Sequence, residues 1–246
     1  MNETPKEWFE SWFDSPYYPI LYRHRDDAEA QEALVNLHKQ LSLPPSATVL
    51  DLCCGQGRHS RTLHALGYHV VGIDLSPSSI AYANERSIPG QRFEVQDMRN
   101  FSLNERFDAV FNLFTSFGYF RDQTENLSVL SQIYKHLNPG GTLVLDYLNA
   151  SAINVKEDSL KEQTIDGIVF RTRKFIEGES VVKTIEILDN TQHFQFHERV
   201  QLITLEHFST MLEQSGFELA AVYGNYQLGA YTPQESPRCL IIASKS

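Results

Sequence analysis

The sequence lacks the features that mark secreted, membrane-spanning and zinc-binding proteins. It has three cysteines, Cys53, Cys54 and Cys239, which cannot all pair with one another and which form no Cys-x-x-Cys pair. No apolar run approaches the roughly 20 residues that span a bilayer. No basic segment near the start leads into an apolar stretch with a cleavage site. These absences predict a cytoplasmic protein with no metal and no membrane partner.

Positive charge is also scarce. Twenty-one Lys and Arg stand against 31 Asp and Glu, which gives a formal charge of −10 in a chain of 246 residues. A field of this sign repels polyanions, so we expect no nucleic-acid partner. Aromatic residues, by contrast, are plentiful: 11 Tyr, 15 Phe and 2 Trp supply bulk for a core and for an apolar binding site.

Strand and helix signals alternate along the middle of the chain. Three helices are expected, which begin at a glycine turn, at Ser76-Pro77 and at Thr124. One face of the third helix carries Leu127, Leu130, Tyr134 and Leu137, and the helix is expected to end at Pro139-Gly140-Gly141. This alternation is typical of a parallel sheet with helices on both faces. The predicted strands are 48–52, 69–73, 92–95, 107–112 and 142–148.

The pattern changes after Asn149. Residues 165–203 alternate with period two and are broken by Glu177-Gly178-Glu179 and Asp189-Asn190, which indicates antiparallel hairpins. A helix from Thr204 with Leu205, Phe208 and Leu212 inward, and strands at 217–223 and 239–243, then resume the first pattern. N-terminal to the first predicted strand, aromatic residues from Trp8 to Tyr18 precede an expected helix over 26–41. We therefore expect a doubly wound, mostly parallel seven-stranded α/β sheet with an antiparallel β insert after the fifth strand.

The glycine turn admits two interpretations. A dinucleotide site of a nicotinamide-dependent oxidoreductase also places such a turn between its first strand and helix. Here Gly55-Gln56-Gly57 is not followed by the third glycine, and Asp51 lies at the strand end, where it would oppose a pyrophosphate. Asp51 suits a cationic ligand that carries an amino group and a sulfonium.

Val49-Leu50-Asp51-Leu52-Cys53-Cys54-Gly55-Gln56-Gly57 resembles the first motif of class I S-adenosylmethionine-dependent methyltransferases, with Cys53 where that family most often has glycine. The resemblance continues through most of the chain and implies a Rossmann-like methyltransferase fold. The segments similar to the four later motifs are Gly72-Ile73-Asp74-Leu75-Ser76, Gln96-Asp97-Met98, Phe107-Asp108-Ala109-Val110-Phe111 and Leu137-Asn138-Pro139-Gly140-Gly141-Thr142.

The resemblance implies S-adenosylmethionine as cofactor and S-adenosylhomocysteine as product. Asp74 would accept both ribose hydroxyls and Asp97 the adenine amino group, while Leu75 and Met98 sandwich the ring. One acid alone would be interpreted as a helix cap or solvated strand end, but three at successive strand ends favour a binding site. The cofactor-binding candidates are Tyr22, Asp51, Cys53, Gly55, Gly57, Asp74, Leu75, Asp97, Met98, Asn112, Leu113 and Phe114.

The reaction implied by the resemblance is in-line attack of a nucleophile on the sulfonium methyl group. Such catalysis rests largely on holding donor and acceptor in line, so no dedicated triad is expected. Candidates for a base are Tyr22, His24, Tyr147 and His197; candidates for binding the acceptor are Tyr18, Phe117, Tyr119, Tyr147, Arg173, Glu198 and Arg238.

Three of these residues have a structural alternative. Glu198 is the one acid on an otherwise apolar strand face, and pairing with Arg171 or Arg173 on a neighbouring strand is the favoured interpretation, ahead of a place in the acceptor site. His197 is expected on a solvated strand face. Arg238 would bind an acceptor carboxylate or cap the sheet edge.

The sequence thus predicts a single methyltransferase domain over 1–246 that methylates a small molecule, as a monomer or homodimer. Its expected parts are an N-terminal lid and helix (1–45), a cofactor-binding core (46–150), a β insert over the acceptor site (151–203) and the last helix and strands (204–246). A non-catalytic S-adenosylmethionine-binding sensor or partner subunit is the main alternative. The motifs leave open whether oxygen, nitrogen, sulfur or carbon is methylated.

Overall fold

The computed structural model describes residues 7–23, 27–153 and 159–246. It divides into two compact units, each assembled from two separate stretches of the chain. The first unit is Met1–Arg25 with Ile153–Leu202, and the second is Asp26–Ala152 with Ile203–Ser246. In the part of the chain that the structure describes, no helix has the length and apolar character needed to cross a membrane.

The second unit is built on a seven-stranded sheet in the order β10-β11-β5-β4-β1-β2-β3. Neighbouring strands from β5 to β3 are parallel, whereas β11 is antiparallel to both β5 and β10. The predicted doubly wound, mostly parallel sheet is confirmed. Its strands are β1 (Thr48–Leu52), β2 (His69–Asp74), β3 (Gln91–Val95), β4 (Phe107–Asn112), β5 (Leu137–Leu148), β10 (Phe217–Tyr223) and β11 (Arg238–Lys245).

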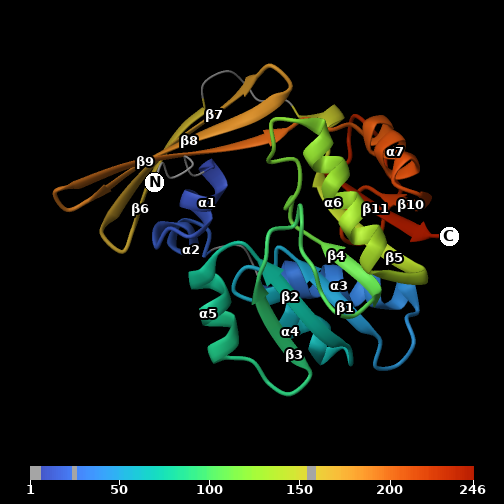
Figure 1. Cartoon of the computed structure of the whole chain (residues 1–246). Coiled ribbons are helices and arrows are strands. Elements are labelled where there is room, and N and C mark those ends of the chain that lie inside the picture. Colours follow the sequence, from blue (N-terminus) through green and yellow to red (C-terminus); the bar gives the residue numbers. More distant parts are fainter. Residues whose placement is uncertain (1–6, 24–26, 154–158) are drawn as a thin grey trace, which may run out of the picture. The chain divides into compact units, whose positions relative to one another are not determined.

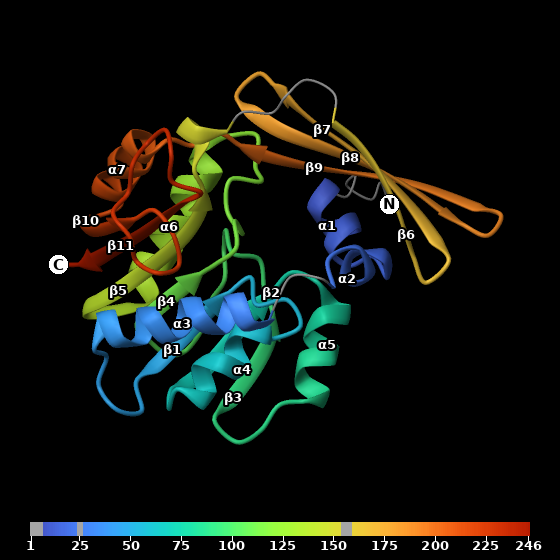
Figure 2. The same ribbon diagram turned by 180° about the vertical axis from the view of Figure 1, so that it is seen from behind.

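Helices cover both faces of this sheet (Figures 1 and 2). α6 and α7 lie toward the viewer in Figure 1, and α3, α4 and α5 do so in the reverse view. Ser76, Asp122 and Thr204 begin α5, α6 and α7 as N-caps, because each side chain accepts a hydrogen bond from a backbone N–H of the first turn. The helices are α3 (Asp27–Leu41), α4 (Arg58–Ala65), α5 (Pro77–Glu85), α6 (Gln123–His136) and α7 (Leu205–Gln214), with a short 3₁₀ turn at Ala150–Ala152.

Helix α6 differs from its sequence prediction. Val129, Leu130 and Ile133 are fully buried, whereas Leu127 and Tyr134 are only half-buried, so the inward stripe is rotated from the predicted one. Tyr134 packs edge-on against Phe217, with ring centroids 5.2 Å apart. The helix also ends at His136, and β5 begins immediately afterwards, upstream of the predicted terminator.

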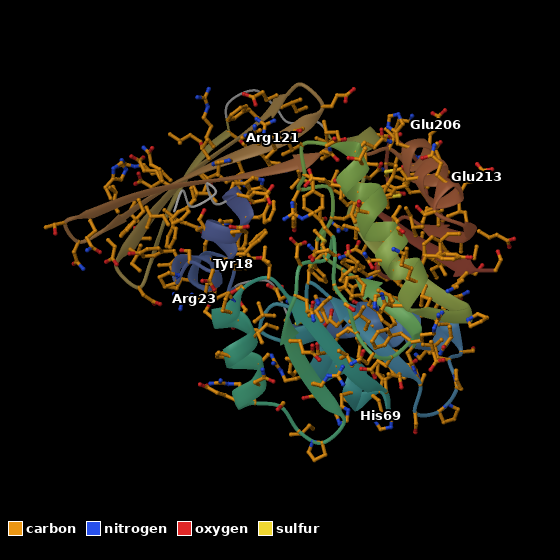
Figure 3. All side chains as sticks on the ribbon, viewed as in Figure 1. Tyr18, Arg23, His69, Arg121, Glu206 and Glu213 are labelled. Carbon is orange, nitrogen blue, oxygen red and sulfur yellow. The ribbon has the colours of Figure 1, made fainter. Side chains whose placement is uncertain are left out.

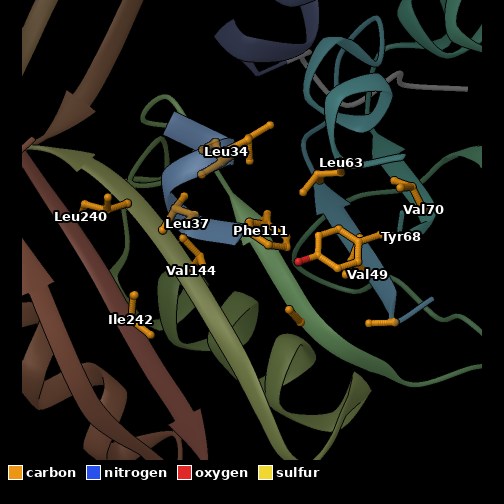
Figure 4. Close-up of a cluster of buried hydrophobic side chains, with 13 residues drawn as sticks. Leu34, Leu37, Val49, Leu63, Tyr68, Val70, Phe111, Val144, Leu240 and Ile242 are labelled. Carbon is orange, nitrogen blue, oxygen red and sulfur yellow. The ribbon is translucent and has the colours of Figure 1, made fainter. Parts of the chain in front are cut away.

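The core between α3, α4 and the sheet consists of aliphatic and aromatic side chains (Figure 4). Leu34 and Leu37 of α3 and Leu63 of α4 are each 1% exposed and pack on Val49 and Phe111 of the central strands. Burying such a side chain contributes about 1.5–3 kcal/mol. This packing fixes the central strands, and with them the positions of the loops that follow them.

The first unit is a four-stranded antiparallel sheet in the order β6-β7-β8-β9, packed with two short helices. The predicted hairpins are confirmed: Glu177 pairs with Ser180, and Asp189 pairs with Gln192. The prediction missed β6, which lies upstream of the predicted insert strands. Its residues are mostly exposed and show no apolar alternation, so the sequence gives no strand signal there. The elements are α1 (Trp8–Phe13), α2 (Tyr17–Leu21), β6 (Ser159–Ile165), β7 (Ile168–Glu177), β8 (Ser180–Asp189) and β9 (Gln192–Gln201).

Gly72 of β2 generates a stability prediction. A Cβ added at this position would lie 2.6 Å from Cδ1 of Phe93 and 2.9 Å from Sγ of Cys54, both of them in a buried cluster. We expect Gly72→Ala to lower the free energy of unfolding by about 1–3 kcal/mol through overpacking. Urea denaturation measures this, with Val95→Ala at an exposed site as the control, which should stay within about 0.5 kcal/mol. Equal effects of the two variants would contradict the packing argument.

Candidate active site

The three predicted strand-end acids converge in the second unit. Because β1, β2 and β3 are parallel, their carboxyl ends meet at one edge of the sheet. The backbone N–H of Gly55 donates to Oδ2 of Asp74 at 2.9 Å, which joins the glycine turn to the end of β2. Sδ of Met98, after β3, lies 3.5 Å from Sγ of Cys53. Residues from three loops are thus brought within contact distance.

Asp51 is a buried carboxylate at this edge. Its side chain is 1% exposed, and Oγ of Ser60 donates to Oδ2 at 2.5 Å. Burial raises the pKa of Asp51 to about 6, and the negative charge of Asp74 adds to the effect. A cation bound beside it would favour the ionised form, so this position suits a positively charged ligand group.

The turn after β1 adopts backbone angles that favour glycine. Gly55 and Gly57 have φ values of 53° and 76°, and Cys53 has a φ of 64°, which explains why a glycine is common at that place in the resembling family. An added Cβ at Gly55 would meet no atom within 4 Å, whereas one at Gly57 would lie 3.1 Å from the ring of Phe93. The turn therefore leaves open space above Gly55. Burial, together with nearby carboxylates, raises the pKa of the Cys53 thiol well above its usual range, which keeps the thiol neutral.

Asp74 and Asp97 carry different hydrogen-bond loads. Oδ1 of Asp74 accepts from the N–H of Ser76 at 2.9 Å, in addition to the bond from the glycine turn. A carboxylate offers about four acceptor positions, which suits it to several hydroxyl or N–H donors at once. Asp97 instead pairs with Arg99, whose Nη2 donates to Oδ2 at 2.6 Å and whose Nη1 donates to Glu125 at 2.8 Å. The sequence prediction missed Arg99, although its position two residues after the acid was visible.

Asn112 ends β4 with a buried amide. Nδ2 donates to the carbonyls of Leu52 at 3.3 Å and Ser116 at 3.0 Å. Among the described residues, Oδ1 is buried and accepts no hydrogen bond. Two residues with left-handed backbone angles follow, Phe114 with φ 55° and Thr115 with φ 65°. Such conformations cost on the order of 1–3 kcal/mol each and persist where the surroundings enforce them.

A network around Asp146 enforces them. Asp146, fully buried in β5, accepts at Oδ2 from the N–H of Phe114 and from the hydroxyl of Tyr226, both at 2.8 Å. Nε of Arg238 donates to Oδ1 at 2.9 Å, and Nη2 donates to Oγ1 of Thr115 at 2.8 Å. We call these five residues the Asp146 network. Arg238 therefore donates to two protein groups of the network, and its contact with an acceptor carboxylate stays a prediction.

The ring of Phe114 links this network to helix α4. It stacks on His59, with centroids 4.9 Å apart and planes 28° apart, and on Tyr226, with centroids 5.5 Å apart. The guanidinium of Arg58 lies 4.8 Å from the centroid of the same ring. These ring contacts consequently join the segment after β4 to the first residues of α4, so the two segments are fixed relative to each other.

Two acceptor candidates of the second unit belong to its core. Phe117 and Tyr147 are 0% exposed, and Tyr147 packs edge-on against Phe208 with centroids 5.0 Å apart. Burial also raises the pKa of Tyr147, which opposes the predicted role as a base. Tyr119, only partly buried, donates its hydroxyl to the carbonyl of Thr115 at 2.7 Å. Leu75 and Leu113 lie next to the strand ends, as their positions in the chain require.

The remaining candidates belong to the first unit. The favoured pairing of Glu198 with Arg171 or Arg173 is wrong: Oε1 of Glu198 accepts from Trp12 and Tyr22, while Arg171 donates to Glu162. The reason is that Arg171 and Arg173 lie on the other face of the sheet, because residues of β7 alternate between faces.

Three further candidates also have defined surroundings. Arg173 is exposed, with its guanidinium 5.6 Å from the ring centroid of Phe175. His197 is exposed, as expected, with its ring 6.0 Å from Trp8. Tyr18, labelled in Figure 3, packs on the ring of Tyr22 at 5.0 Å. His24 lies outside the described residues.

The part of the chain that the structure describes contains no set of side chains suited to bind a metal ion. No group of three or more His, Cys, Asp or Glu side chains in the described ranges is arranged to hold an ion. The chemistry available at the strand ends is recognition of a cationic, hydroxyl-bearing ligand by carboxylates and backbone groups.

Comparison with known proteins agrees with this chemistry. Residues 49–141 match the family described as a methyltransferase domain. The dTDP-3-amino-3,6-dideoxy-α-D-glucopyranose N,N-dimethyltransferase of Streptomyces fradiae is 37% identical over 123 residues, which are 50% of this chain and 46% of that enzyme. The chain therefore spans about half the length of this relative.

Two solved structures are similar over nearly their whole length. The sugar N-methyltransferase KedS8 from Streptoalloteichus sp ATCC 53650 has a TM-score of 0.75 and 26% identity, covering 93% of this chain and 92% of that one. The amino pentose methyltransferase CalS10 from Micromonospora echinaspora, solved with S-adenosylmethionine bound, has a TM-score of 0.71 and 25% identity, covering 94% and 98%.

The Asp146 network generates a second stability prediction. Asp146→Ala would leave Arg238 without its buried carboxylate and would release the backbone N–H of Phe114. We expect a loss of about 3–5 kcal/mol in the free energy of unfolding. Asp122→Ala, which removes the N-cap of α6, is the control and should cost about 1 kcal/mol. Chemical denaturation distinguishes the two, and equal losses would refute the role given to the network.

Proposed function

We propose that this chain is a class I S-adenosylmethionine-dependent methyltransferase that transfers a methyl group to the amino nitrogen of a small molecule. The observation that carries the proposal is the meeting of Asp51, Asp74 and the glycine turn at one sheet edge, where they suit a cationic nucleoside. The nitrogen is supported by three similar proteins whose names specify amino sugars or sugar N-methylation. Nitrogen is therefore favoured over oxygen, sulfur and carbon.

The residues of the second unit fit the cofactor. The raised pKa of Asp51 marks a carboxylate that gains by meeting an ammonium group, and the open space above Gly55 leaves room for the amino-acid part. Asp74 would bind the ribose hydroxyls, and Asp97 would meet the adenine amino group with Leu75 and Met98 against the ring. The buried acceptor Oδ1 of Asn112 is a further group for a donor to satisfy.

The chemistry asks little of the protein beyond position. The sulfonium of the bound cofactor supplies an activated methyl group. The Asp146 network holds the backbone of Phe114 and Thr115 in left-handed conformations, so the loop after β4 is fixed before any ligand binds. Preorganisation of this kind favours in-line transfer, because the entropic cost of ordering the loop is already met in the folded protein. A cytoplasmic location and a small-molecule partner complete the proposal.

An acceptor assay tests the function. The protein is incubated with S-adenosylmethionine and dTDP-3-amino-3,6-dideoxy-α-D-glucopyranose, and formation of S-adenosylhomocysteine and of methylated sugar is followed by mass spectrometry. The same sugar with a hydroxyl in place of the amino group is the control. We expect methylation of the amine alone, and a panel of amino sugars and amino acids widens the search. Tight cofactor binding with no turnover on any amine would favour the non-catalytic sensor; turnover on the hydroxyl compound would refute nitrogen.

The pKa of Asp51 predicts how cofactor binding depends on pH. Asp51 has a pKa of about 6 in the free protein, and a bound ammonium group favours the ionised form. Affinity for S-adenosylhomocysteine should therefore be constant above pH 7. It should fall about tenfold by pH 5, because most Asp51 carboxyl groups are protonated there and must lose the proton when the ligand binds. Isothermal titration calorimetry measures this, and Asp51→Asn should flatten the profile. An unchanged affinity of the native protein at pH 5 would refute the contact.

A further inference from the structure

Arg99, in the turn after β3, bonds two carboxylates of the second unit. Its guanidinium donates from Nη2 to Oδ2 of Asp97 at 2.6 Å, and from Nη1 to Oε1 of Glu125, in the first turn of α6, at 2.8 Å. The guanidinium carbon also lies 4.9 Å from the ring centroid of Phe120, a buried side chain just before α6. All four residues belong to the second unit. Arg99 is thus held by groups from both sides of the gap between β3 and α6.

The carboxylate of Asp97 is almost fully occupied by Arg99. Besides the bond to Nη2, Oδ1 accepts from the backbone N–H of Arg99 at 2.8 Å. The Nε–H group of Arg99 is shared between Oδ1 at 3.1 Å and Oδ2 at 3.0 Å. Three N–H groups of one residue therefore bond the two oxygens. Because a carboxylate has about four acceptor positions, the described residues leave about one position for a further donor.

A ligand can reach the remaining acceptor position. The side chain of Asp97 is 20% exposed and that of Arg99 is 21% exposed, so the pair lies at the surface and not in the core. Met98, between them in the chain, contacts Sγ of Cys53 in the glycine turn through its sulfur at 3.5 Å. This contact connects the Asp97 loop to the turn that we propose to bind the cofactor.

Adenine and hypoxanthine would present different groups to this position. The amino group on C6 of adenine donates N–H, whereas the carbonyl oxygen on C6 of hypoxanthine only accepts and is repelled by a carboxylate oxygen. Hypoxanthine has its donor on the neighbouring ring nitrogen, N1. A carboxylate that can turn would follow the donor from one ring position to the next. A carboxylate that is held in place distinguishes the two bases, since its oxygen stays aimed at one position.

Arg99 supplies the restraint that such discrimination needs. A planar guanidinium that bonds a carboxylate through two N–H groups fixes the plane of that carboxylate, which a single point charge does not. The bond from Arg99 to Glu125 and the contact with Phe120 keep the pair from turning together. The entropic cost of ordering the Asp97 side chain is therefore met in the folded protein and not on binding.

We propose that Arg99 is a positioning residue that restricts Asp97 to a single N–H donor and so makes the cofactor site selective for adenine over 6-oxopurines. This inference rests on the proposed function, because it requires the cofactor to bind at the carboxyl ends of β1, β2 and β3. Asp97 makes the contact with the base, and Arg99 acts through Asp97.

A comparison of two ligands on the same protein tests the role of Arg99. Isothermal titration calorimetry measures the affinities for S-adenosylhomocysteine and for S-inosylhomocysteine, which carries a carbonyl oxygen in place of the amino group. We expect the native protein to prefer S-adenosylhomocysteine about 100-fold, since the oxo compound leaves Asp97 facing another acceptor. Arg99→Met frees the carboxylate to turn and should lower this ratio of affinities about tenfold.

Two further variants make the comparison specific. Arg92→Met is the matched control, because Arg92 on β3 also bonds two carboxylates, those of Glu94 and Glu105, and should keep the ratio within about twofold. Arg99→Lys retains the charge but not the planar fork, so its ratio should lie between those of Arg99→Met and the native protein. A loss of folded protein lowers both signals equally. A merely structural role of Arg99 would therefore leave the ratio unchanged.

The outcomes separate this inference from the proposed function. An unchanged ratio in Arg99→Met, or in Arg99→Lys where the first variant does not fold, overturns the role of Arg99 and leaves the methyltransferase function standing. Equal affinities of the native protein for the two ligands overturn it as well. A native protein that binds neither ligand contradicts both the inference and the proposed function. A ratio that falls in Arg99→Met and not in Arg92→Met supports the inference.

Discussion

The parallel pairing of β1 through β5 is the constraint on which the site depends. Strands that run in one direction end at one edge of the sheet, so loops that are distant in sequence must lie side by side there. The bond from the backbone of Gly55 to Asp74 and the contact of Cys53 with Met98 are consequences of that arrangement. The core packing of α3 and α4 matters to function because it fixes the strands that place these loops.

The carboxylates at this edge of the sheet have two kinds of surroundings. Asp97 and Asp146 pair with arginines of the protein, Arg99 and Arg238, so their charges are balanced within the protein. Asp51 has a hydroxyl partner and a raised pKa, and so remains responsive to an incoming cation. The contrast distinguishes carboxylates whose charge the protein itself balances from one that is suited to recognition of a cation.

Much of the fold was predictable because its signals are local. β1 and β4 have the predicted bounds, and Ser76 and Thr204 cap the helices that they were expected to begin, since caps and glycine turns act within a few residues. The partners of Glu198 and Asp146 were not predictable, because Trp12 lies 186 positions from Glu198 and Arg238 lies 92 positions from Asp146. The left-handed backbone at Phe114 likewise depends on contacts that only the folded chain supplies.

The assembly of each unit from two separate stretches has a consequence for synthesis. The aromatic helices α1 and α2 leave the ribosome well before β9 does, and the sheet that packs on them is completed only when β9 has been translated, since Glu198 follows Trp12 by 186 positions. During that interval the exposed rings of Trp8, Trp12 and Tyr17 are candidates for chaperone binding and for aggregation. The N-terminal segment thus sets a kinetic demand on biogenesis, and expression yield should respond to translation speed and to temperature.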